Sequence, residues 1–183
     1  MRENWERAGF GIYIHWPFCE AKCPYCDFNS HVSKKIDQKA WTNAYLREIT
    51  NSYQYTSNMV LSTIFFGGGT PSLMYAETVH KIISHIKSLW KVAENLEVTL
   101  EAKPSSVETS KFTEYKSAGI NRVSIGVQSL DNNSLKYLGR LHTSQEAISA
   151  IEVGKSTFDR VSFDLIYSRQ HQSISSWEAE LLS

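Results

Sequence analysis

The chain has 183 residues, of which 42% are hydrophobic and 12% aromatic, values typical of a folded globular protein rather than a disordered one. Its 19 lysines and arginines balance its 19 aspartates and glutamates, which argues against nucleic-acid or membrane-surface binding driven by overall charge. No apolar run approaches the roughly 18 residues that a membrane span needs, and the charged N-terminus lacks the apolar segment of a secretory signal, so we expect a cytoplasmic protein.

The first half of the chain alternates apolar strands with helices. Residues 11–16 predict a strand that ends before a proline, and the three cysteines of the chain follow in a loop. Residues 38–57 predict a helix, because Trp, Tyr and Ile recur there at every fourth position. Residues 61–66 predict a second strand, which the glycine triplet at 67–69 breaks sharply. An apolar stripe over residues 79–90 predicts the next helix.

The second half continues this alternation. A third strand at residues 96–100 precedes a helix that starts at about Ser110 and ends at Gly119, a residue suited to a helix C-cap. The remaining elements are a fourth strand at 122–127, a helix that runs from a Thr143–Glu146 capping box to residue 153, a fifth strand at 161–166, and a last helix from about Ser173, inside which the chain ends.

This order of elements predicts an α/β fold. Strands that alternate with helices form a parallel sheet with helices outside it, wound right-handed. Five strands cannot close an eight-stranded barrel, so we expect a partial parallel (βα) barrel that is open, or a sequence that is truncated. No long linker or short-period repeat divides the chain, and one domain is the simplest arrangement.

Polar residues gather at one predicted edge of this sheet. Chemistry in parallel sheets and barrels collects at the carboxyl ends of the strands. At or near these ends lie the cysteines after the first strand, the glycines after the second, Glu101 after the third, Gln128 after the fourth, and Asp164 in the fifth.

The cysteines carry the strongest single signal. Cys19, Cys23 and Cys26 follow the spacing C-x3-C-x2-C, and an odd, clustered set is poor material for a disulfide framework. One loop with this spacing can wrap three thiolates around an iron–sulfur cubane and leave one iron open for another ligand. A zinc site completed by His15 or His31 is the alternative, as are unligated thiols.

The other candidates each have a plainer explanation when taken singly. The glycine triplet can bring backbone N–H groups close to a ligand, or it can be a simple strand-to-helix turn. The plainer explanations of the rest are an exposed strand end for Glu101, a backbone hydrogen bond for Gln128, a solvated cation for Arg140, an internal salt bridge for Asp164, and core packing for Tyr13 and Tyr25.

Taken together, five ordered motifs resemble a known family. They are Tyr13-Ile-His-Trp-Pro-Phe-Cys19, the cysteine spacing, Phe66-Gly-Gly-Gly-Thr-Pro-Ser72, Arg122-Val-Ser-Ile-Gly-Val-Gln-Ser129 and Asp164-Leu-Ile-Tyr167. The sequence resembles the oxygen-independent coproporphyrinogen III oxidase group of radical S-adenosylmethionine (SAM) proteins from about Gly11 to its end.

The resemblance implies two cofactors and assigns the residues of the motifs to them. Cys19, Cys23 and Cys26 would hold a [4Fe-4S] cluster, and SAM would bind the open iron through its amino and carboxylate groups. An electron from the cluster would cleave SAM to methionine and a 5′-deoxyadenosyl radical. By the same resemblance, Tyr13 and Tyr25 would lie against cluster and SAM, Gly68, Gly69 and Thr70 would offer backbone to the methionine end, and Glu101, Gln128, Arg140 and Asp164 would form the polar SAM contacts.

Two branches of the group differ beside the third cysteine. The true oxidases, which decarboxylate coproporphyrinogen III, carry a further cysteine where this chain has Phe28. The Cys-Asp-Phe pattern and the stretch from Leu138 to His142 are more similar to the heme-chaperone branch, which implies binding of heme and its transfer to client proteins. The alternatives are an oxidase that acts on a porphyrinogen with an electron donor, and an inactive truncated fragment.

The sequence departs from the family pattern at three places. Ser168-Arg-Gln-His-Gln172 stands where the family commonly has Gly-x-Pro-Gly-Gln, which puts the geometry of that loop in doubt. Lys103 stands where asparagine or aspartate is usual and alters the local charge. The family's sixth strand and C-terminal domain have no counterpart, so we expect residues 1–183 to be a radical SAM core domain truncated at its C-terminal end.

Overall fold

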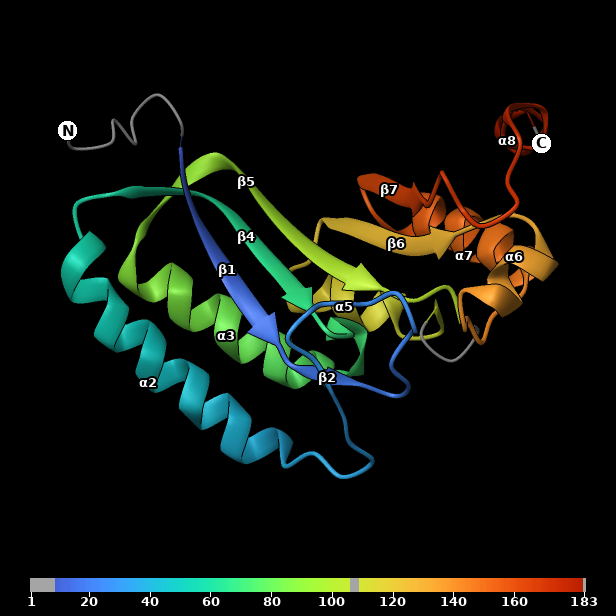
Figure 1. The fold of residues 1–183 in the computed structure, drawn as a ribbon. Helices are drawn as coiled ribbons and strands as arrows, with labels where there is room; N and C mark the ends of the chain where they lie inside the picture. Colours follow the sequence, from blue (N-terminus) through green and yellow to red (C-terminus); the bar gives the residue numbers. More distant parts are fainter. Residues whose placement is uncertain (1–8, 106–108, 183) are drawn as a thin grey trace, which may run out of the picture.

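Five parallel strands form one continuous sheet in the computed structural model, which describes residues 9–105 and 109–182 (Figure 1). The spatial order is β1-β4-β5-β6-β7, and every neighbouring pair is parallel. The strands are β1 (Phe10–Trp16), β4 (Val60–Gly68), β5 (Lys91–Ala102), β6 (Arg122–Gln128) and β7 (Arg160–Leu165). In the described part of the chain β1 and β7 are the two edges, so the predicted open parallel (βα) barrel is confirmed.

Helices connect these strands and cover one face of the sheet (Figure 1). They are α2 (Gln38–Thr56), α3 (Ala76–Leu89), α5 (Phe112–Ala118) and α7 (Ser144–Thr157). The predicted capping box of α7 is present: the Thr143 hydroxyl accepts from the Glu146 N–H, and the Glu146 carboxylate accepts from the Thr143 N–H. Gly119 ends α5 in the left-handed conformation, as its position predicted.

The hydrophobic core lies between the sheet and these helices. Alternate residues of β6, Val123, Ile125 and Val127, point toward it and are fully buried. Ile82 and Ile86 of α3 pack into the same core. The residues of β6 between them face the other side of the sheet, where the strand ends carry polar groups. Packing in the core therefore determines which side chains of each strand point to the opposite face, where they can line a functional site.

The outer part of the fold contains short elements that were not predicted. β2 (Phe18–Cys19) pairs with β3 (His31–Val32) and closes the cysteine loop. The turn η1 (Pro71–Leu73) follows β4, and α6 (Asn132–Tyr137) follows β6. Elements of two to six residues are too short to leave a periodic pattern in a sequence.

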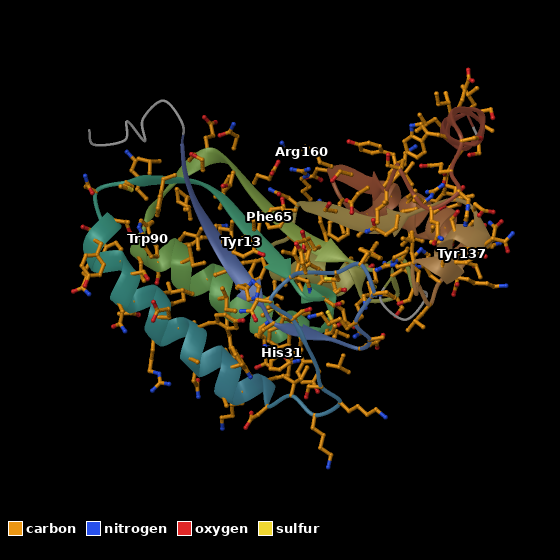
Figure 2. The ribbon with its side chains drawn as sticks, viewed as in Figure 1. Tyr13, His31, Phe65, Trp90, Tyr137 and Arg160 are labelled. Carbon is orange, nitrogen blue, oxygen red and sulfur yellow. The ribbon has the colours of Figure 1, made fainter. Side chains whose placement is uncertain are left out.

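Two predicted boundaries were wrong. The glycine triplet does not break the second strand sharply, because Gly67 and Gly68 still pair with His15 and Trp16 of β1. A Cβ at Gly67 would come within 2.8 Å of the Tyr13 ring, so this glycine makes room for an aromatic side chain that stacks on Phe65 (Figure 2). The last helix, α8 (Ile174–Leu181), ends at Leu181 rather than continuing to the end of the chain.

No helix within residues 9–105 and 109–182 has both the length and the apolar character needed to cross a membrane.

Candidate functional site

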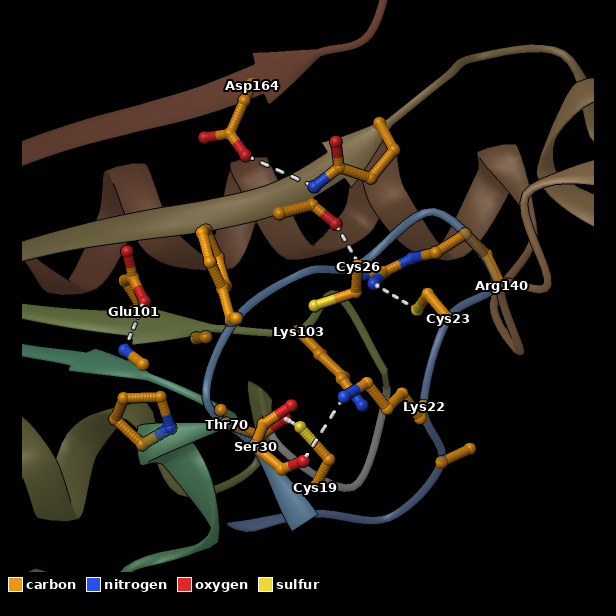
Figure 3. A pocket seen from close by; sticks show the side chains of 18 of the residues that line it. Cys19, Lys22, Cys23, Cys26, Ser30, Thr70, Glu101, Lys103, Arg140 and Asp164 are labelled. Carbon is orange, nitrogen blue, oxygen red and sulfur yellow. Dashed lines mark hydrogen bonds between the residues drawn. The ribbon is translucent and has the colours of Figure 1, made fainter. Parts of the chain in front are cut away.

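A pocket opens at the carboxyl ends of the strands, where the polar residues were predicted to gather (Figure 3). Its lining includes these residues singled out from the sequence: Cys19, Cys23, Tyr25, Cys26, Phe28, Gly68, Gly69, Thr70, Glu101, Lys103, Gln128, Arg140 and Asp164. They come from the cysteine loop and from four of the five strands or their following loops. The parallel topology thus assembles one site from residues spread over more than half of the chain.

The cysteine loop is folded by backbone hydrogen bonds rather than by a disulfide. The His31 N–H donates to the Pro17 carbonyl at 2.7 Å, and the Cys26 N–H donates to the Cys23 carbonyl at 3.0 Å. Cys19 is buried, whereas Cys23 and Cys26 are partly exposed, and all three thiols are free. The loop therefore presents three sulfur atoms to the pocket from one short segment.

The thiols suit a cluster better than a single metal ion. No three His, Cys, Asp or Glu side chains in the described residues come close enough to share one ion. His15 lies against the Asn29 carbonyl at 2.9 Å, and His31 is exposed on β3, so neither completes a zinc site with the cysteines. Thiolates around a cubane bind different irons and stand farther apart than those around one ion, which fits three sulfurs spread over one pocket.

The glycine loop after β4 is pressed against the cysteine loop. The Gly69 N–H donates to the Trp16 carbonyl at 2.6 Å, and the Thr70 N–H donates to the Phe18 carbonyl at 2.8 Å. A Cβ at Gly69 would lie 2.6 Å from the Phe18 carbonyl oxygen, so only glycine permits this approach. The close packing sets the position of the Cys19 segment.

The N–H groups of the glycine loop have acceptors within the protein. The sequence left open whether these groups approach a ligand or the triplet is a simple strand-to-helix turn. The Gly68 N–H donates to the Glu101 carboxylate at 3.2 Å, and those of Gly69 and Thr70 are used as described above. Any backbone contact from Gly68, Gly69 or Thr70 to a ligand is therefore left to carbonyl oxygens.

Two carboxylates line the pocket, Glu101 from β5 and Asp164 from β7, and β6 lies between these strands. Burial raises the pKa of Glu101, the Gly68 N–H opposes that shift, and the Asp164 carboxylate adds to it. Burial also raises the pKa of Asp164, against the effects of Gln128 and Arg140. Asp164 accepts from Gln128 Nε2 at 3.2 Å and forms no salt bridge within the described residues, unlike the plainer explanation suggested for it.

Gln128 holds its place through an unusual backbone conformation. Its φ of 71° lies in the left-handed region, which is rare for a residue with a long side chain. The Ile166 N–H donates to the Gln128 carbonyl at 2.9 Å, which ties the end of β6 to the end of β7. The backbone strain thus coincides with the point where Gln128 reaches Asp164.

Arg140 is not the solvated surface cation that it could have been. Its Nη2 donates to the Gly126 carbonyl at 2.7 Å, and its Nη1 lies 3.6 Å from Cys23 Sγ. Arg140 also lowers the pKa of the nearby His142, for which burial is the larger cause and the resulting value is about 4. His142 is therefore neutral near pH 7 and bonds the Val127 carbonyl at 3.0 Å.

The two tyrosines do not share one position. Tyr25 lines the pocket, and burial is the main cause that raises its pKa to about 12. Tyr13 does not line this pocket, is 57% exposed, and stacks on Phe65 further down the sheet (Figure 2). Its contact with a cofactor stays a prediction.

Sequence reasoning missed two features of the site. Ser30 lines the pocket and is buried, although nothing distinguishes it from an ordinary loop serine in the sequence. Arg169 and Glu180 form a buried ion pair beside Gln128, and their pairing joins a loop to a helix 11 residues away. Only the loss of the family's glycines in the 168–172 loop hinted that this region is unusual.

The sequence matches the model of the Radical SAM superfamily over residues 13–178. Among curated proteins, it is 39% identical to the heme chaperone HemW of Escherichia coli over 165 residues and 40% identical to that of Haemophilus influenzae over 169 residues. Each of these matches covers 89% of this chain but 44% of the relative, so the chain spans less than half the length of these proteins.

A further relative and a solved structure extend the comparison. The chain is 35% identical to radical S-adenosyl methionine domain-containing protein 1, mitochondrial, of Bos taurus, over 93% of this chain and 39% of that protein. The structure of coproporphyrinogen III oxidase from E. coli, a radical SAM enzyme, superposes with a TM-score of 0.83. That match covers 94% of this chain and 40% of the other at 22% identity, and it shows a shared fold.

Proposed function

The chain belongs to the radical SAM superfamily, and from this premise we propose that it binds a [4Fe-4S] cluster and SAM at the strand ends and acts as a heme chaperone. The observation that carries the proposal is the gathering of Cys19, Cys23 and Cys26 in one pocket with the carboxylates Glu101 and Asp164. The family implies the two cofactors, and the similarity to proteins named heme chaperone HemW supports the role.

The proposed division of labour follows from the chemistry of each side chain. The three thiolates hold the cluster, and Arg140 stabilises the negative charge beside Cys23. Glu101 and Asp164 face the cationic groups and hydroxyls of SAM, and the Gln128 amide orients Asp164. The glycine loop sets the distance between the Cys19 segment, to which Gly69 and Thr70 are hydrogen-bonded, and Glu101, to which Gly68 is hydrogen-bonded. When bound, the cofactor pair supplies one-electron reductive chemistry, which the protein positions and shields.

Heme transfer would be the function of the whole protein. The proposed partners are heme, a client that accepts it, and a donor of single electrons. Free thiols that must stay reduced suit the cytosol, which is the location that we propose. A single radical SAM core domain over residues 1–183 is the proposed organisation of this stretch, which spans less than half the length of the HemW relatives.

Iron–sulfur reconstitution tests the cofactor part of the proposal. Under anaerobic conditions the chain should become brown and bind about four irons. Replacing any one of the three cysteines by serine should abolish iron retention. Ser33→Ala, which changes a partly exposed neighbour that does not line this pocket, should retain it. Stoichiometric zinc with no uptake of iron would contradict the cluster.

Heme titration tests the chaperone part. Absorbance spectra should show stoichiometric heme binding, and mixing with an apo-heme protein should move the heme to that protein. The second candidate is a coproporphyrinogen III oxidase, which the shared fold with the E. coli enzyme favours. Phe28 lines the pocket where the oxidases carry their further cysteine, which opposes it. Anaerobic conversion of coproporphyrinogen III to protoporphyrinogen IX, with no heme transfer, would replace the chaperone role by the oxidase.

A further inference from the structure

In the described part of the chain, a buried hydroxyl without a hydrogen-bond partner lies in the pocket that the three cysteines line. Ser30 is only 5% exposed, lines the pocket, and has a buried hydroxyl with no partner among the described residues. Leaving a buried hydroxyl unpaired costs about 1–3 kcal/mol. Such an orphan inside a functional pocket points to an acceptor that the protein itself does not provide.

Ser30 is held firmly at this place. The N–H of the next residue, His31, donates to the Pro17 carbonyl at 2.7 Å, and the Ser30 carbonyl accepts from Lys22 Nζ at 3.5 Å. β2 and β3 keep the Ser30 segment beside the Cys19 segment, and Figure 3 shows Ser30 and Cys19 on the same side of the pocket. The orphaned hydroxyl therefore lies close to the first cysteine.

Thr70 presents a second hydroxyl to that cysteine. Its Oγ1 donates to Cys19 Sγ at 3.5 Å, and the residue is only 1% exposed. The Thr70 N–H donates to the Phe18 carbonyl at 2.8 Å, which fixes the backbone from which this hydroxyl projects. A buried hydroxyl of the protein thus donates its hydrogen bond to a sulfur atom.

Arg140 makes the same arrangement at the second cysteine. Its Nη1 donates to Cys23 Sγ at 3.6 Å, and its Nε is buried with no partner among the described residues. The bond from Nη2 to the Gly126 carbonyl holds the guanidinium in place. Two cysteines of the loop therefore each have a donor from outside the loop.

We infer that Ser30, Thr70 and Arg140 form a donor shell that hydrogen-bonds the sulfur atoms of the cluster and raises its reduction potential. The inference rests on the proposed cluster and goes beyond it by giving these side chains an electronic role. Thiolate and sulfide sulfurs are acceptors, and their negative charge increases when the cluster takes up an electron. Donors therefore stabilise the reduced form more than the oxidised form.

A redox titration followed by electron paramagnetic resonance, on the reconstituted chain without SAM, tests this shell. Thr70→Val keeps the side-chain shape and removes the hydroxyl, and Ser30→Ala removes the orphaned donor. Each should shift the midpoint potential to a lower value, and the double variant should shift it further. Thr70→Ser keeps the donor and should titrate close to the wild type, as should Ser33→Ala.

The outcomes separate this inference from the function on which it rests. A wild-type chain that binds no cluster overturns both. A wild-type chain that binds a cluster, with Thr70→Val and Ser30→Ala titrating at the wild-type potential, overturns the donor shell and leaves the cluster in place. Iron content of each variant, measured beforehand, ensures that the potentials compare loaded proteins.

Discussion

Arg169 and Glu180 form an ion pair in which only 9% and 6% of the respective side chains are exposed. Glu180 also accepts from the Ser129 hydroxyl at 2.6 Å and from the Leu130 N–H at 2.7 Å. Arg169 reaches the Ile166 carbonyl at 3.0 Å and the Gln128 carbonyl at 3.4 Å. The pair therefore ties α8 to the ends of β6 and β7, next to the pocket.

Breaking this pair should destabilise the chain strongly. Glu180→Gln leaves the Arg169 charge buried without its counter-ion, and such changes typically cost about 3–5 kcal/mol. Urea unfolding should show this loss, whereas Asp159→Asn, which breaks the exposed pair with Lys116, should cost less than about 1 kcal/mol. Equal losses for the two variants would mean that the buried pair contributes no more to stability than the exposed pair.

The loop before α8 contains two residues whose replacement by glycine should stabilise the chain. Ser168 and His171 have φ angles of 58° and 62°, and they occupy the two positions where the resembling family commonly has glycine. A left-handed conformation costs a residue with a side chain about 1–2 kcal/mol. We expect Ser168→Gly and His171→Gly to raise the free energy of unfolding by roughly 1 kcal/mol each, as measured by urea denaturation.

The matched control for these glycines is Ala179→Gly, at an exposed position within α8. Glycine in a helix interior is less favourable than alanine, so that variant should lose about 0.5–1 kcal/mol. If all three glycine variants shift stability in the same direction, the conformational explanation fails.

Gly69 should be intolerant of even one methyl group. Gly69→Ala places a Cβ against the Phe18 backbone, which must move together with the neighbouring Cys19. We expect a loss of about 1–3 kcal/mol and weaker iron retention after reconstitution. In Gly154→Ala the new Cβ makes ordinary contacts at 3.4 Å within a helix, so stability should stay or rise. Iron retention unchanged in Gly69→Ala would separate the glycine loop from the cysteine site.

The raised pKa of Glu101 should appear in the pH dependence of both stability and ligand binding. Between its unfolded and folded pKa values the folded chain binds more protons, so ionisation of this buried carboxyl lowers stability as pH rises. Glu101→Gln, which can still accept from Gly68, should therefore be more stable than wild type at pH 7 without ligand, and this advantage should vanish in acid.

Binding of SAM should depend on Glu101 in the opposite sense. The ammonium and sulfonium charges of SAM favour the ionised carboxylate, so affinity should fall as pH decreases through the raised pKa. Isothermal titration of the reconstituted chain at several pH values measures this. Glu101→Gln should bind SAM more weakly and with a flatter pH profile; a wild-type affinity in that variant would remove Glu101 from the site.

Local sequence signals predicted the frame of the fold well. The five strands, the capping box at Thr143 and the end of α5 at Gly119 depend on neighbouring residues, and all are present. The topology then brings the cysteines, Glu101, Gln128 and Asp164 to one pocket, as their places at the strand ends indicated.

What the sequence could not predict depends on contacts across the fold. Ser30 has the same local context as an exposed loop serine until β2 and β3 bury it. Arg169, the partner of Glu180, lies in a loop outside the helix that carries Glu180, so no helical pattern links the two residues. The N–H groups of the glycine loop have acceptors that only tertiary packing reveals. These are long-range effects on which periodicity carries no information.

The left-handed backbone of Gln128 places two incompatible demands on one position. The conformation favours glycine, asparagine or aspartate, whereas the bond to Asp164 requires an amide on a longer side chain. In a saturation library, selection for folding and selection for cofactor binding should therefore enrich different residues at position 128. The native glutamine is the compromise, and a selection for stability alone should replace it.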